Sequence, residues 1–284
     1  TTEAMAHLQK ASQIKPDEVV PYYNLANILH GKGKISSAIE HYQKALKADP
    51  DFANAHKNLA ITLQGRGRLV EAVSHLQQAI RIKPDDASPH LTLGLISKEQ
   101  GNPDKAIEHF ERALQLNPDY AEAHSKLAMV LQEQKKVAQA IKHYQQALKI
   151  KPDFTEAQFN LANALYSQGN VGEAIEYYKQ VLSIMPKHPV VLTRLAWIRA
   201  THPDAKWRDG AQAVALAEQC CQITQNKMIP ALNTLAAAYA EVGRFEDAVK
   251  WQVKAIERTP EANQPELKAR LQLYKAGKPY RGKF

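Results

Sequence analysis

The sequence predicts an all-α protein, a solenoid in which antiparallel helix pairs are stacked one after another. A chain of 284 residues is longer than one compact core usually organises, so several domains or a repeat array are expected. Proline recurs every 34 residues, and small and bulky apolar residues recur at fixed distances before it. The prolines are Pro16, Pro50, Pro84, Pro118, Pro152 and Pro186.

Each period holds two amphipathic helices. In the first full period, Tyr22, Leu25, Ala26 and Leu29 follow the i, i+3, i+4, i+7 spacing of one helical face. On the second helix an alanine and a bulky apolar residue recur before each proline. The alanines are Ala4, Ala38, Ala72, Ala106, Ala140 and Ala174, and the bulky residues are Leu8, Tyr42, Leu76, Phe110, Tyr144 and Tyr178. Small residues let helices approach closely, and the bulky ones fill the space beside them.

A glycine stands between the two helices of most periods, where a chain leaving a helix turns into the left-handed conformation. These glycines are Gly33, Gly67, Gly101, Gly169 and Gly243. Lys135 takes the same place in one period, so we expect a strained or differently shaped turn there.

This pattern resembles the tetratricopeptide repeat (TPR) in length, helix order and key residues. The resemblance implies a right-handed superhelix whose first helices line a concave groove. It covers nearly the whole chain, with about seven units over 19–262, and the sixth, about 189–228, carries an insertion between its helices near 201–210. Residues 1–18 match the second helix of a truncated repeat, and 263–284 are expected to form a capping helix and a basic tail.

The ends suggest a piece of a longer protein, because the chain opens on half a repeat without methionine. Its C-terminal stretch resembles the ends of large bacterial TPR proteins, some of which join such arrays to a membrane glycosyltransferase-like domain. No apolar run is long enough to cross a membrane, so this piece is expected to be soluble, and a membrane-tethered parent protein stays open. The compartment stays open too, because the neighbours Cys220 and Cys221 make no disulfide framework.

The histidines form two columns rather than a cluster. His7, His41, His75, His109 and His143 recur every 34 residues on second helices, and His56, His90 and His124 recur on first helices. Successive units stack roughly 10 Å apart, too far for two members of a column to share one ion. Cys220 is expected to pack where other units have alanine. We therefore expect no catalytic residue, no metal site and no cofactor, and a protein that is not an enzyme.

Partners are expected on the side of each first helix that faces away from the core. The groove candidates are Tyr23, Asn24, Asn27, Lys57, Asn58, Lys126, Phe159, Asn160, Asn163, Tyr166, Arg194 and Trp197. Asn24, Asn58 and Asn160 share one slot, and an amide can pair with any peptide backbone. This slot resembles the asparagine ladder in the TPR arm of O-linked N-acetylglucosamine transferases. Thr92, Lys126, Arg194 and Thr234 interrupt it.

The fifth and sixth units hold the richest patch, because Phe159, Tyr166 and Trp197 lie there with Arg194. Aromatic residues beside arginine are typical of interaction hot spots. In an alternative reading, Trp197 packs against the insertion that carries Trp207.

These features predict a scaffold that binds a peptide or protein segment. The net charge of +8 favours an acidic partner. Self-association and the role of a glycosyltransferase's TPR arm are the alternatives. Nucleic acid is not expected as a partner, because the groove has no continuous basic stripe.

Overall fold

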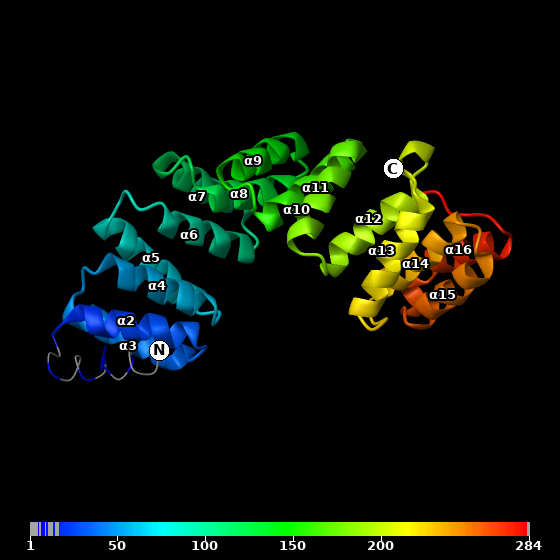
Figure 1. Ribbon diagram of the computed structural model, residues 1–284. Helices are drawn as coiled ribbons and strands as arrows, with labels where there is room; N and C mark the ends of the chain where they lie inside the picture. Colours follow the sequence, from blue (N-terminus) through cyan, green and yellow to red (C-terminus); the bar gives the residue numbers. More distant parts are fainter. Residues whose placement is uncertain (1–4, 6, 9, 11–13, 15–16, 283–284) are drawn as a thin grey trace. The chain divides into compact units, whose positions relative to one another are not determined.

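The computed structural model describes residues 5, 7–8, 10, 14 and 17–282 of the chain. Within these ranges it contains fifteen α-helices, α2–α16, two short 3₁₀ turns and no strand, so the all-α prediction is confirmed (Figure 1). None of the helices in the described ranges is long and apolar enough to cross a membrane. Ala4 and Pro16, which belong to the predicted columns, lie outside the described residues.

The chain divides into two compact units, Thr1–Ile150 and Lys151–Phe284. In the first unit each first helix is followed by a short turn and an antiparallel second helix. The pairs are α2 (Val19–Gly31) with α3 (Ile35–Ala48), α4 (Ala53–Gln64) with α5 (Leu69–Ile82), α6 (Ser88–Glu99) with α7 (Pro103–Leu116), and α8 (Ala121–Glu133) with α9 (Val137–Ile150).

The second unit repeats this arrangement and adds a final helix. Its pairs are α10 (Thr155–Ser167) with α11 (Val171–Ile184), α12 (Pro189–Thr201) with α13 (Gly210–Ile223), and α14 (Ile229–Glu241) with α15 (Phe245–Glu257), followed by α16 (Pro265–Lys275). Residues 202–209 join α12 to α13 and include a 3₁₀ turn, Ala205–Trp207. A second 3₁₀ turn, Glu261–Asn263, precedes α16.

The alanine column lets the helices of a pair approach closely. Ala38, Ala72 and Ala106 are fully buried, and Tyr42, Leu76 and Phe110 fill the space beside them. The packing is tight at Gly94 of α6, where an added β-carbon would lie 2.4 Å from Cε1 of Phe110. The periodicity in the sequence therefore has its origin in packing.

The turn at Lys135 has the same shape as the glycine turns. Lys135 has φ 62°, close to the 72° of Gly33. The hydrogen bonds agree as well: Lys136 N–H donates to the Leu131 carbonyl at 2.8 Å, as Lys34 N–H does to Leu29 at 2.9 Å. The expectation of a different shape is thus wrong, and the left-handed strain of a non-glycine residue remains.

Candidate functional site

The groove candidates of the first unit lie on first helices and are largely engaged with one another. The Asn27 Oδ1 atom accepts hydrogen bonds from the Tyr42 hydroxyl at 2.6 Å and from Asn58 Nδ2 at 2.9 Å. Asn58 also donates to the Tyr23 hydroxyl at 3.0 Å. Burial raises the pKa of Tyr42 to about 12, so its hydroxyl stays a donor. These amides tie α2, α3 and α4 together, whereas Asn24 is exposed.

The basic candidates of this unit are partly buried. Lys57 Nζ forms an ion pair with Asp86 Oδ2 at 2.9 Å. Asp86 also accepts a hydrogen bond from the Ser88 backbone N–H at 2.9 Å, so the carboxylate fixes the start of α6. Lys126 is half-buried on α8. Lys57, which was predicted to meet a ligand, is thus already paired with a carboxylate.

In the second unit, Asn163 has the role that Asn27 has in the first. Its Oδ1 accepts from the Tyr178 hydroxyl at 2.7 Å. Phe159 packs between the rings of Tyr178 and His188, at centroid distances of 6.3 and 5.9 Å. Burial raises the pKa of Tyr166 on the same helix. These side chains join α10 to its neighbours, and Asn160 is half-buried beside them.

The ring of Trp197 packs against the C-terminal end of the chain. Its ring lies 5.8 Å from that of Tyr280, in the C-terminal tail, and the Arg270 guanidinium of α16 lies 5.0 Å above it. Trp207 instead lies against Gly172, where an added β-carbon would come within 2.9 Å of its Cη2 atom. The interpretation that pairs Trp197 with the insertion is therefore wrong.

A hollow of about 300 Å³ opens beside Trp197 on the first helices α12 and α14. Its lining combines apolar and polar side chains: Val190, Thr193, Arg194, Trp197, Met228, Pro230, Asn233 and Thr234. Arg194 is exposed, while Thr193 and Thr234 are buried at the base. The hollow offers an aromatic wall, apolar contacts and one guanidinium at its edge. Of the predicted groove residues, the structure brings Arg194 and Trp197 together here.

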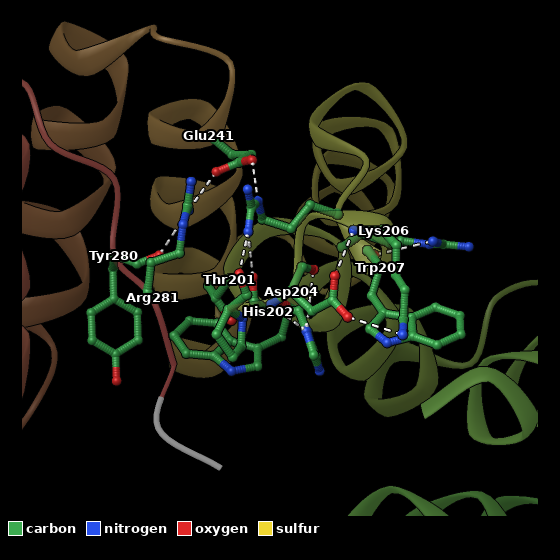
Figure 2. Close-up of polar contacts among 12 residues, drawn as sticks. Thr201, His202, Asp204, Lys206, Trp207, Glu241, Tyr280 and Arg281 are labelled. Atoms are coloured by element: carbon green, nitrogen blue, oxygen red, sulfur yellow. Dashed lines mark hydrogen bonds and ion pairs between the residues drawn. The ribbon is translucent and has the colours of Figure 1, made fainter. Parts of the chain in front are cut away.

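The insertion and the C-terminal tail meet at Glu241, at the end of α14 (Figure 2). Arg208 Nε donates to Glu241 Oε1 at 2.9 Å, and Arg281 Nη1 donates to Oε2 at 2.5 Å. The Gly282 backbone N–H donates to the Thr201 carbonyl at 2.9 Å. One carboxylate thus holds two segments that are far apart in the sequence.

The two histidine columns meet in pairs in three of the repeat units, as His56 with His75, His90 with His109, and His124 with His143. Nδ1 of His56 lies 2.9 Å from Nδ1 of His75, and Nε2 of His56 lies 3.0 Å from the Pro50 carbonyl. Because a carbonyl only accepts, Nε2 of His56 carries the proton and Nδ1 accepts from His75. His124 and His143 repeat the arrangement, with their Nδ1 atoms 3.0 Å apart.

Spacing along one column hides this pairing, because the partners lie in different columns. The ring centroids of His56 and His75 are 5.1 Å apart, while their Nδ1 atoms are only 2.9 Å apart. The two Nδ1 atoms therefore lie between the rings and point towards each other. This is the geometry of an N–H···N hydrogen bond. No group of three or more histidine, cysteine or acidic side chains in the described residues is arranged to hold a metal ion.

The two cysteines are packing residues. Both are buried and unpaired with each other, and the Cys220 sulfur lies 3.2 Å from the Thr193 hydroxyl. Burial raises the pKa of Cys221 to about 12, so its thiol stays protonated. A protonated, buried thiol is a poor nucleophile.

Family models match most of the repeated region. The TPR domain of cytochrome c-type biogenesis protein H matches residues 74–190, a TPR-repeat model matches 26–67, and another tetratricopeptide-repeat model matches 57–83 and 231–265. The repeats are tetratricopeptide repeats. No curated protein sequence matches the chain.

Solved structures share the TPR fold. A crystal structure of MamA is 29% identical with a TM-score of 0.50, over 57% of this chain and 95% of that one. YrrB, described as a TPR protein with an unusual peptide-binding site, is 23% identical with a TM-score of 0.50, over 66% of this chain and 96% of its own. The APC/C hetero-tetramer Cut9-Hcn1 is 21% identical with a TM-score of 0.68, over 84% of this chain and 46% of that chain.

Sequence reasoning missed three residues that join the C-terminal tail to the second unit: Arg270, Glu241 and Tyr280. Glu241 occupies an ordinary polar position in the repeat pattern, Arg270 lies on the final helix outside the repeats, and Tyr280 lies in a stretch without periodicity. The basic character of the tail was visible, but no local pattern indicates which surface such a tail covers.

Proposed function

We propose that this TPR array is a protein-interaction scaffold, which binds an extended segment of a partner on α12 and α14. The observation that carries the proposal is the hollow beside Trp197. It offers apolar contact from Val190 and Met228 and an exposed guanidinium from Arg194 at the edge. Such a site suits an apolar side chain followed or preceded by a carboxylate, because arginine pairs with carboxylates through two parallel hydrogen bonds.

The chemistry of the surroundings supports binding rather than catalysis. The thiols in the unit are buried and protonated, and the uncharged polar side chains of the lining, Thr193, Asn233 and Thr234, are buried as well. Aromatic residues and arginine are enriched where interfaces gain most of their affinity. The peptide-binding site named for YrrB supports the same class of function, and the net charge of +8 supports an acidic partner.

The proposal is tested by selecting peptides from a random phage-displayed library against the whole chain. Enriched sequences are expected to carry an apolar residue next to aspartate or glutamate. Arg194→Glu should raise the Kd of these peptides about tenfold, which corresponds to about 1.4 kcal/mol. Both Kd values are measured by fluorescence anisotropy.

Lys187→Glu is the matched control. It makes the same charge change at an exposed turn position just before α12, outside the hollow. This variant should bind like the unmodified chain, and neither variant should change the melting temperature. Enriched peptides without acidic residues, or equal weakening by both variants, would contradict the proposal. Light scattering over a range of concentrations distinguishes it from self-association.

A further inference from the structure

The C-terminal tail, residues 278–282, is an extended strap that follows a complete helix end. Gly277 adopts φ +66°, and the Lys278 N–H donates to the Leu273 carbonyl at 2.9 Å, which closes α16. Leu267 and Tyr274 bury the core face of α16, and Tyr280 of the strap packs at the edge of the same core cluster. The hydrogen bond that closes α16 ends at Lys278, so residues 279–282 take no part in closing the helix.

Four contacts of different kinds hold the strap on the second unit. The Tyr280 ring lies 5.8 Å from the Trp197 ring, and the Arg270 guanidinium lies 4.7 Å from Tyr280. The Arg281 side chain donates to Glu241, and Figure 2 shows the tail reaching this carboxylate. The Gly282 N–H donates to the carbonyl of Thr201, in the last turn of α12.

The residues that receive the strap are also held by contacts that do not involve the strap. Glu241 is held from the other side by Arg208, whose guanidinium also donates to the carbonyl of His202 at 2.8 Å. Arg270 is placed over Trp197 by hydrogen bonds to Asn233 at 3.2 Å and Glu266 at 3.0 Å. A preorganised carboxylate, an aromatic slot and an acceptor on the backbone are what an extended peptide with an aromatic residue before arginine would bind.

We infer that the strap is a built-in ligand, which occupies in cis a docking surface for a partner segment with an aromatic residue directly followed by arginine. This inference rests on the proposed function, because Trp197 borders both the hollow and the strap. A partner anchored in the hollow would displace the strap and place its own aromatic–arginine pair on Trp197 and Glu241.

The strap competes strongly with a free partner segment for this surface, because the strap is tethered to it. A short tether gives an effective concentration on the order of millimolar, so a free segment binds the intact chain weakly. Removing the strap should therefore reveal affinity for the same sequence supplied in trans. The chain provides its own probe, the synthetic peptide Gly-Lys-Pro-Tyr-Arg-Gly-Lys-Phe, which corresponds to residues 277–284.

The test compares the intact chain with a variant that lacks residues 279–284 and so keeps the Lys278 hydrogen bond that closes α16. The shortened chain should bind the peptide in fluorescence anisotropy, with an apparent Kd at least about tenfold lower than that of the intact chain. Peptides with Tyr280→Ala or Arg281→Glu should lose this binding. Glu241→Gln in the shortened chain should weaken the unmodified peptide as well.

A second variant guards against a folding defect. The intact chain with Tyr280→Ala and Arg281→Glu keeps its length but should release the strap, and it should also bind the peptide in trans. No peptide binding by either variant would overturn the inference, and so would unfolding of both variants at room temperature, which would make the strap part of the core. If either of these results is obtained but library peptides still bind the intact chain in a manner that depends on Arg194, the proposed function stands and only the inference about the strap fails.

Discussion

At the scale of single residues, Asn27 and Asn163 of the first helices hold helix pairs together. Asn163 and Tyr178 are linked through a hydrogen bond between α10 and α11, as Asn27 and Tyr42 are between α2 and α3. In the third period the corresponding pair is Leu95 and Phe110, without either polar group. In these two periods, the asparagine amide thus provides the acceptor that the buried tyrosine hydroxyl needs.

Replacing Asn163 should therefore destabilise the second unit. Asn163→Ala leaves the buried Tyr178 hydroxyl without its acceptor, which should lower the free energy of unfolding by about 1–3 kcal/mol. Asn163→Leu combined with Tyr178→Phe, which copies the third period, should recover much of the loss. Urea unfolding followed by tryptophan fluorescence measures both.

Asn160→Ala is the control for this prediction, because Asn160 lies one turn earlier on the same helix and is half-buried. It should change stability by less than about 0.5 kcal/mol. An equal loss in the two alanine variants would mean that the hydrogen bond to Tyr178 is not the cause.

At the scale of helices and turns, most of the architecture could be predicted. The 34-residue period indicated the helix pairs, since Ala38 and Tyr42 pack where their spacing placed them. The histidine pairs could not be predicted by the same means. His56 and His75 belong to different columns, and their contact depends on how two antiparallel helices align, which periodicity along one helix does not specify.

The turn before α9 gives a test of backbone strain. Lys135→Gly should raise the free energy of unfolding by about 1 kcal/mol, because a left-handed non-glycine residue costs about 1–2 kcal/mol and glycine returns part of this as entropy of the unfolded chain. The φ angle of Lys136 is not positive, so Lys136→Gly relieves no strain. It only increases the conformational entropy of the unfolded chain and should therefore lower the free energy of unfolding. Thermal unfolding by circular dichroism distinguishes the two. Equal shifts for both variants would contradict this account.

At the scale of the whole molecule, the two units should respond differently to acid. Burial lowers the pKa values of five histidines in Thr1–Ile150: His75, His90, His109, His124 and His143. In the second unit, burial lowers the pKa of His202. Gln158 and Tyr177 of this unit occupy the repeat positions of His56 and His75. Below the ordinary value of 6.5, the unfolded chain binds protons that the folded chain does not. The free energy of unfolding therefore falls as pH falls from 6.5 towards the folded-state values.

The tryptophans make this difference measurable. Trp197, Trp207 and Trp251 all lie in the second unit, so their fluorescence reports that unit, whereas far-ultraviolet circular dichroism reports both. Between pH 7.5 and pH 5.5 the urea midpoint by circular dichroism should fall more than the midpoint by fluorescence. His56→Gln with His75→Tyr, which copies Gln158 and Tyr177, should reduce this separation. Parallel shifts by both probes would contradict the prediction.

The candidate site was predicted only in part at this scale. Arg194 and Trp197 were found from the first-helix pattern, because the repeat fixes which face of α12 is turned away from the core. Tyr280 and Arg281 were not, because an extended tail carries no period and its path is decided by distant side chains such as Glu241.

The path of the tail has a practical consequence for anyone who handles this protein. An affinity tag, a fluorescent protein or a surface linker fused after Phe284 would continue from Gly282, which is hydrogen-bonded to α12. Immobilising the chain through that end would pull on the segment that lies against Trp197. Affinities measured in that orientation should differ from those measured with an attachment at the exposed Gln225 turn between α13 and α14.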